Sequence, residues 1–127
     1  MIDSQLYIDL PSSCYRPGET LSGEILWALD EAPETIELSL GWWTEGRGNK
    51  DACIEKKLKW KSMQTAGKAS FEMKLPESPY SFEGHLISLK WALELRTTKG
   101  EESTTLNLVI APGGKPVELS LIEDDEG

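Results

Sequence analysis

The sequence predicts an all-β domain, a sandwich of two antiparallel sheets with about seven or eight strands. Three observations lead to this prediction. Short runs alternate between apolar and polar residues along most of the chain, which is the period of a strand with one buried side. These runs recur roughly every 10 to 15 residues and are separated by turn-forming glycine and proline. No stretch of about 11 residues or more shows the apolar period of a helix.

The first half of the chain contains four predicted strands. The first ends at Pro11, and the second contains Gly23, which predicts a bulge or the close approach of another backbone. The third ends its inward face at Trp42, so Trp43 should point outward, and a turn-rich segment follows at residues 44–51. The predicted inward residues of the four strands are Leu6, Ile8 and Leu10; Leu21, Gly23, Ile25, Trp27 and Leu29; Ile36, Leu38, Leu40 and Trp42; and Ile54, Lys56, Leu58 and Trp60.

The second half contains four more predicted strands. A turn around Gly67 leads to the fifth, and a proline-rich loop at residues 76–84 is expected to be a structural connection more than a recognition loop. The sixth strand, at residues 87–95, is the longest apolar alternation in the chain. The predicted inward residues are Ala69, Phe71, Met73 and Leu75; Ile87, Leu89, Trp91, Leu93 and Leu95; Leu106, Leu108 and Ile110; and Val117, Leu119 and Leu121.

The length and composition fit one globular domain. A chain of 127 residues buries about two-thirds of its unfolded surface in one core. Hydrophobic residues make up 39% and charged residues 28%, which disfavours wholesale disorder. We expect the sandwich to span residues 1–122, followed by an acidic tail at residues 123–127.

Composition and charge also exclude several classes of function. The formal net charge is −9, from 22 acidic and 13 basic residues, so neither nucleic acid nor an anionic membrane is expected as the general partner. No run reaches the roughly 20 apolar residues that span a bilayer, so no membrane insertion is expected. The first ten residues lack a basic region followed by an apolar run, so we expect a cytoplasmic protein.

One outward face collects positive charge in this acidic chain. Lys57, Lys59 and Lys61 alternate with inward residues of the fourth strand and therefore share one side. The third and fourth strands are expected to form a hairpin, which would place Trp43 beside these lysines. The lysines are either a patch for an acidic partner or a face that guards the strand against aggregation. Trp43 is either an interface residue or packs under a loop or bulge. Trp43 and the three lysines are the candidate partner-binding site.

Two segments carry a resemblance to a known family. Residues 15–23 (YRPGETLSG) resemble the opening of arrestin-like domains, where a turn with Pro or Gly leads into a strand bearing Leu-x-Gly. Residues 71–95 resemble their middle, with Phe-x-Met-x-Leu-Pro, then Pro-Tyr-Ser-Phe-Glu-Gly, then a strand carrying Trp. The resemblance implies an immunoglobulin-like sandwich of two antiparallel sheets. It also implies noncatalytic adaptor or scaffold binding, often in trafficking or receptor regulation.

The chain departs from full arrestins in two respects. Full arrestins have two such sandwiches in tandem, and 127 residues leave room for one. The basic pair that phosphate-sensing arrestins carry just after the first strand falls here at Pro11, Ser12 and Ser13. The resemblance therefore implies the fold and protein binding, but it does not imply phosphate sensing.

The sequence offers little for catalysis or metal binding. His85 is the only histidine, and no serine or cysteine signature points to it, so we do not expect an enzyme. One histidine and two separated cysteines fall short of a four-ligand zinc site, and we expect no cofactor. Cys14 and Cys53 are too few for a disulfide scaffold and are expected to stay reduced.

These observations lead to one hypothesis about function and three alternatives. We expect a noncatalytic, single-domain arrestin-like module that binds a protein partner, with strand addition at an unpaired sheet edge as an available mode. The second interpretation is a structural subunit of a homo-oligomer or larger assembly. The third is a sandwich that binds a small ligand or carbohydrate, since five tryptophans are many for this length. An enzyme comes last.

Overall fold

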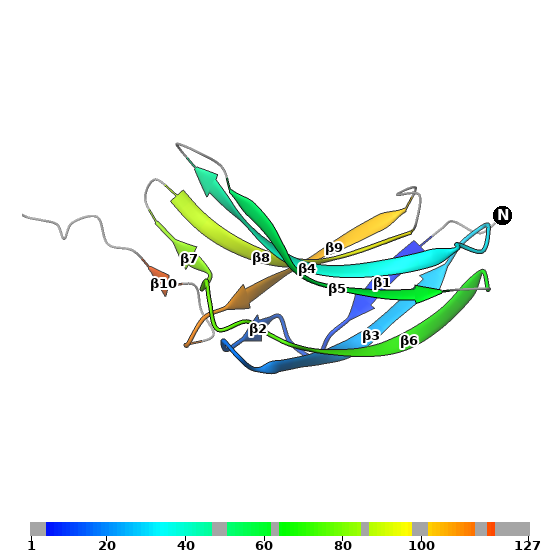
Figure 1. Cartoon of the computed structure of the whole chain (residues 1–127), viewed down its shortest axis with the longest axis horizontal. Coiled ribbons are helices and arrows are strands. Elements are labelled where there is room, and N and C mark those ends of the chain that lie inside the picture. Colours follow the sequence, from blue (N-terminus) through cyan, green and yellow to red (C-terminus); the bar gives the residue numbers. More distant parts are fainter. Residues whose placement is uncertain are drawn as a thin grey trace, which may run out of the picture.

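The computed structural model describes residues 5–46, 51–61, 64–84, 87–97, 102–113 and 117–118, and it confirms the all-β prediction. Two sheets pack face to face, and the described residues contain no helix. Figure 1 shows the smaller sheet below the larger one, which bends along its length. The chain is therefore a β-sandwich, as its period-two runs predict.

The two sheets differ in size. The smaller sheet has the antiparallel order β1 (Gln5–Asp9), β3 (Thr20–Ala28), β6 (Ala66–Lys74). The larger sheet has the order β10 (Val117–Glu118), β7 (Phe82–Glu83), β8 (Ile87–Thr97), β4 (Thr35–Gly46), β5 (Ala52–Lys61). β8 also pairs with β9 (Ser103–Ile110), which in turn pairs with β2 (Cys14–Tyr15). β4 and β8 therefore form the centre of the larger sheet.

The core lies between the sheets and consists of the inward residues of the long strands. The buried residues from the larger sheet include Ile36, Leu38, Leu40, Leu89, Trp91, Leu93, Leu95, Leu108 and Ile110. Those from the smaller sheet and the segments beside it include Ile8, Leu21, Ile25, Phe71, Met73 and Leu75. Trp27, Trp42, Leu58 and Trp60 are partly buried and pack against this core. Apart from Ile54 in β5, the residues of these strands that the period-two pattern predicts to point inward do so.

Two short strands have no signal in the sequence. β2 and β7 contain two residues each, too few to show a period of two. β10 is the described part of the last strand that the sequence predicts from Val117. β2 runs parallel to β9, and β10 runs parallel to β7, so the expectation of purely antiparallel sheets is wrong at these two places. The backbone of Val109 donates to the carbonyl of Ser13 at 2.8 Å in the first pair. Short strands of this kind form where the chain runs beside the edge of a sheet, because the edge strand has unpaired backbone N–H and C=O groups that can form hydrogen bonds.

Gly23 and Gly67 are among the glycines that lie where a side chain has no room. A Cβ on Gly23, in β3, would meet the carbonyl oxygen of Asp9 at 2.5 Å, so the predicted close approach of another backbone is confirmed. The prediction of a turn around Gly67 is wrong, because Gly67 lies inside β6. A Cβ there would meet the ring of Trp27 at 2.8 Å. Packing of an indole across the strand, and not a turn, requires the glycine at this position.

A β-bulge reverses the faces of the first part of β5. Lys56 pairs with Leu40 and Ile54 pairs with Gly41, so Glu55 has no residue opposite it. One extra residue moves the side chains beyond it to the other face. The prediction that Ile54 points inward is therefore wrong: its side chain lies on the outer face and is 54% exposed.

The proline-rich loop between β6 and β8 is tied to the larger sheet by hydrogen bonds. The backbone N–H of Ser81 donates to the carbonyl of Ile110 at 2.7 Å, and the N–H of Ile110 donates to Ser81 Oγ at 2.9 Å. The indole N–H of Trp91 donates to the carbonyl of Pro79 at 3.0 Å. These bonds support the structural role that the sequence predicts for this loop.

Several predicted features lie outside the described residues. They are the last strand beyond Glu118, the acidic tail at residues 123–127, part of the turn at residues 98–101, and His85. The domain boundary at residue 122 therefore stays a prediction.

Candidate functional site

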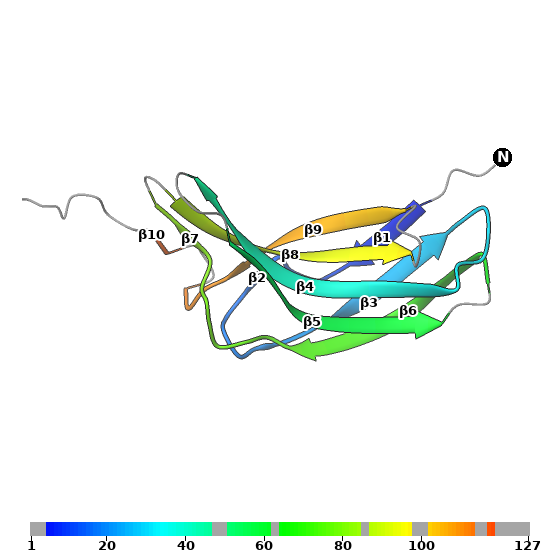
Figure 2. The same ribbon diagram turned by 45° about the horizontal axis from the view of Figure 1, so that its top comes forward.

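The outer face of the larger sheet is concave. Figures 1 and 2 show β4, β5 and β8 bending away from the smaller sheet at one end. Four rows of outward residues cross β5, β4 and β8 in register: Ala52–Trp43–Lys90, Ile54–Gly41–Ala92, Lys57–Ser39–Glu94 and Lys59–Glu37–Arg96. The face therefore divides into an apolar part around Gly41 and a charged part around Glu37.

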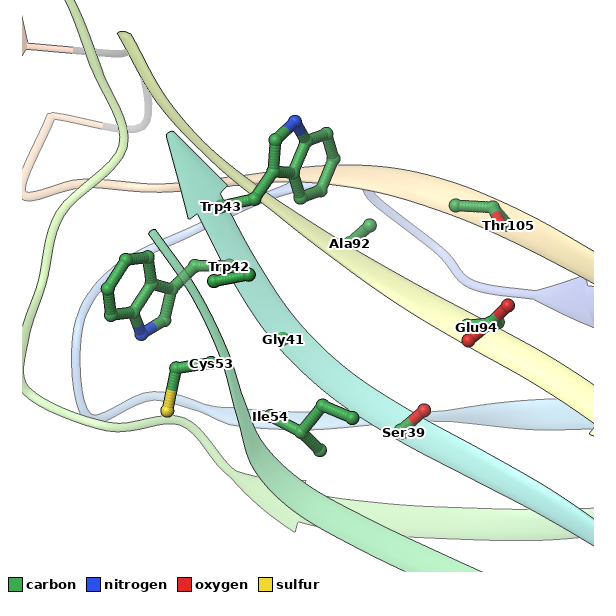
Figure 3. Close-up of a pocket in the computed structure, with 10 residues that line it drawn as sticks. Ser39, Gly41, Trp42, Trp43, Cys53, Ile54, Ala92, Glu94 and Thr105 are labelled. Atoms are coloured by element: carbon green, nitrogen blue, oxygen red, sulfur yellow. The ribbon is translucent and has the colours of Figure 1, made fainter. Parts of the chain in front are cut away.

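A groove with a volume of about 430 Å³ lies in the apolar part. Figure 3 shows Trp43 and Ile54 on different sides of Gly41, with Ala92 on the neighbouring strand. Gly41 and Ala92 carry little or no side chain, so the floor between the two large side chains stays low. The polar side chains that line the groove are Ser39, Glu94 and Thr105. The bulge at Glu55 completes this site, because it brings Ile54 to the outer face.

Trp43 points outward, as the sequence predicts. Its half-buried indole lines the groove, and the indole N–H donates to Glu45 Oε2 at 2.8 Å. Trp42 points the other way, packs against the core and donates to Glu55 Oε2 at 2.9 Å. Two adjacent tryptophans thus have different surroundings: Trp43 lies on the outer face, whereas Trp42 also borders the groove but packs against the core.

The three lysines share the outer face of the larger sheet but lie away from Trp43. Lys57 pairs with Ser39 and Lys61 pairs with Thr35, whereas Trp43 pairs with Ala52. Four positions along β4 correspond to about 13 Å. The prediction of an indole beside the lysine row is therefore wrong, because the hairpin register separates them. The cation that lies opposite Trp43 is Lys90, which forms a salt bridge with Glu45 at 3.4 Å.

A buried carboxylate in the charged part was missed in the sequence. Glu37 is 7% exposed, and both Nε and Nη2 of Arg96 donate to its Oε1, at 3.0 and 2.8 Å. Lys59 Nζ lies 3.9 Å from Oε2. The hydrogen bonds from Arg96 lower the pKa of Glu37, although burial raises it, and the same contact raises the pKa of Arg96. In the sequence, Glu37 is an acidic residue inside a strongly apolar strand, which could have indicated a buried carboxylate. The sequence does not show that Arg96 is its ion-pair partner.

The Glu37–Arg96 pair leaves positive charge on the lysine row. The positive charge of Arg96 already neutralises the negative charge of Glu37. Lys59, which also forms a salt bridge with Glu37, is therefore a second positive charge beside a single carboxylate. Among the described residues, Lys57 and Lys61 form no salt bridge. The row is therefore an exposed positive strip on an acidic protein.

We expect the stability contributed by Glu37 to depend on pH. Its pKa is lower in the folded protein than in the unfolded chain, so this contribution is complete above the unfolded value of about 4.3 and is lost as pH falls through the folded value. Thermal melts should show Glu37→Gln about 3 °C below the native protein at pH 7, a modest shift because solvent reaches Arg96. The difference should shrink toward pH 3. The exposed Glu72→Gln is the control, and a pH-independent difference would contradict the role of the charge.

The described residues contain little that suggests chemistry. They contain no group of three or more His, Cys, Asp and Glu side chains placed to hold a metal ion. Cys14 and Cys53 are exposed free thiols, and a hydrogen bond to Glu55 raises the pKa of Cys53, which disfavours the reactive thiolate. No helix long and apolar enough to cross a bilayer occurs in the part of the chain that the structure describes.

Comparisons with known proteins support the fold. No family model and no curated protein matches the chain. It is similar to the crystal structure of Spo0M, a sporulation control protein from Bacillus subtilis, with a TM-score of 0.62 and 13% sequence identity over 87% of this chain. The chain spans about half of Spo0M, since the alignment covers 50% of that protein. A β-glucosidase from Listeria innocua aligns with a TM-score of 0.46 and 18% identity over 90% of this chain and 16% of the enzyme, a likeness too weak to carry an argument.

The likeness to Spo0M concerns the fold. Spo0M has an arrestin-like fold, so the alignment supports the arrestin-like sandwich that the two sequence segments predict. An identity of 13% says nothing about shared partners.

Proposed function

We propose that this chain is a noncatalytic protein-binding module that uses the concave outer face of its larger sheet. The observation that carries the proposal is the groove between Trp43 and Ile54, where the exposed Ile54 and the half-buried indole of Trp43 form an apolar surface beside the charged part of the same face. Tryptophan in a pocket is a frequent anchor of protein interfaces. The arrestin-like fold supports the proposal, because arrestin-like domains are usually noncatalytic adaptors. Spo0M, named a control protein, is consistent with a regulatory role.

The two parts of the face have different roles in this proposal. The groove supplies apolar surface that a partner desolvates, so it contributes affinity. The lysine row attracts acidic partners over about one Debye length of 8 Å, so it mainly speeds association. A cytoplasmic setting suits the two exposed thiols, because reducing compartments keep such cysteines free.

We expect Trp43→Ala and Ile54→Ser each to reduce partner capture by about tenfold or more. Quantitative mass spectrometry of proteins recovered from native lysate on immobilised native and variant chains measures this loss. Tyr7→Ala is the matched control, since Tyr7 is 60% exposed on the smaller sheet. All three variants should melt close to the native protein, because their side chains lie outside the core.

Two results would contradict this proposal. If both groove variants capture the same proteins as the native chain, the groove is not the binding surface. If light scattering shows a stable oligomer that Trp43→Ala dissociates, the groove serves self-assembly. The structural-subunit interpretation would then replace the adaptor.

A further inference from the structure

The larger sheet ends at a strand with an unpaired margin. Among the described residues, β5 pairs with β4 alone, so alternate backbone N–H and C=O groups of β5 face away from the sheet. β6 is the corresponding margin of the smaller sheet, and Figure 2 shows both strands on the same side of the sandwich. Unpaired margins accept additional strands unless they are protected.

The second part of β5 presents two chemically different faces. Lys57, Lys59 and Lys61 are exposed on the outer face. Leu58 and Trp60 lie on the inner face, where they are partly exposed at the margin of the core. A strand added beside β5 would place alternate side chains opposite the lysines and the remaining ones beside Leu58 and Trp60.

We propose that the margin of β5 binds an extended segment of a partner protein in which acidic and apolar residues alternate. Carboxylates at every second position would lie opposite the exposed lysines. The apolar residues between them would extend the core beyond Leu58 and Trp60. The proposal rests on the proposed protein-binding function, and it names the chemistry of the partner and a second contact beside the groove.

The bulge determines how long the added strand can be. From Lys61 to Lys56 the register with β4 is regular, and it breaks at Glu55. A bulge twists the strand and ends regular pairing. The side chain of Lys56 also points to the inner face, and its charge disfavours an apolar residue of an added strand beside it. The partner segment therefore pairs with residues 57–61, about five residues in length.

The margin of β6 fits such a segment less well. Its inward residues Phe71 and Met73 are each 6% exposed, so an added strand would gain little apolar contact there. Its outward residues mix both signs, since Glu72 lies between Lys68 and Lys74. A second copy of this chain is also disfavoured at β5, because antiparallel pairing of two β5 strands would bring their lysine rows together.

Labelled peptides of one composition test this proposal. The first is acetyl-Gly-Glu-Val-Glu-Val-Glu-Gly-amide, and the second has the same residues in the order Gly-Val-Val-Glu-Glu-Glu-Gly. Fluorescence anisotropy with the full chain should show about tenfold tighter binding of the alternating peptide, because only that order satisfies both faces of β5. Two N-methylated forms, each blocking alternate amides, should differ, since one set of N–H groups faces β5 and the other faces solvent.

Charge exchange tests where the peptide binds. The double variant Lys57→Glu, Lys59→Glu should bind the alternating peptide about tenfold more weakly than the native chain does. It should instead bind the lysine counterpart of that peptide, Gly-Lys-Val-Lys-Val-Lys-Gly. Lys68→Glu with Lys74→Glu on β6 is the matched control and should leave binding unchanged. Hydrogen exchange should show new protection in β5 and none in β6.

The outcomes separate this proposal from the proposed function. Equal binding of both peptide orders, no binding, or loss of binding in the β6 variant would overturn strand addition at β5, and the lysines would then only guard the margin. A dimer that forms through β5 without peptide would also overturn it. If lysate capture still depends on Trp43 in any of these cases, the adaptor proposal stands without its β5 contact.

Discussion

Trp91→Ala is expected to lower the free energy of unfolding by about 4 kcal/mol, the typical cost of truncating a large buried aromatic side chain. Trp91 is 0% exposed and lies in the central strand of the larger sheet. Trp91 pairs with Trp42 of β4 on one side and with Leu108 of β9 on the other, and its ring packs in the core. Truncation also removes the hydrogen bond to Pro79, so the loop before β8 loses one of its attachments.

Chemical denaturation monitored by far-ultraviolet circular dichroism measures this loss. Trp91→Phe is the conservative variant, which keeps an aromatic ring and removes the donor, and it should cost about half as much. If Trp91→Ala does not fold, Trp91→Phe still gives a measurable value. A loss below about 1 kcal/mol for Trp91→Ala would contradict its place in a close-packed core.

Gly23→Ala is expected to destabilise the protein by about 2 kcal/mol, because a new methyl group has no room between β1 and β3. The added carbon would lie 2.5 Å from the carbonyl oxygen of Asp9 and 2.6 Å from Leu10 Cδ2. The leucine can move, but the carbonyl belongs to the backbone of β1, which must shift away from β3.

Thermal melts and hydrogen exchange together test this account. Backbone amides of β1 should lose protection in Gly23→Ala, whereas those of β4 and β8 should change little. Gly113→Ala is the matched control, because a Cβ there meets nothing within 4 Å. Equal melting temperatures for the two variants would show that β1 adapts without cost.

The fold and most of the core could be predicted because the relevant signal is local. Alternation along residues 87–95 assigns Leu93 and Leu95 to the buried face without reference to any other strand. The same local rule gave the outward direction of Trp43 and of the lysines at 57, 59 and 61. The two segments that resemble arrestin-like domains added the class of sandwich, which the likeness to Spo0M supports.

The candidate site could be predicted only in part, because it depends on which residues lie opposite one another. The bulge at Glu55 is visible only in the pairing of β5 with β4, and it alone brings Ile54 to the groove. Register likewise separates Trp43 from the lysines. Glu37 and Arg96 lie 59 positions apart in the chain, and only the neighbouring positions of β4 and β8 join them.

The amino-acid sequence by itself therefore determined the long strands, most of their buried faces and the class of fold, since the pleat of a strand acts between adjacent residues. The tertiary structure decided the register, the bulge, the two short parallel pairs and the open margin of β5. These features depend on backbone hydrogen bonds between segments distant in sequence, which every non-proline residue can form, so side-chain identity specifies them only weakly.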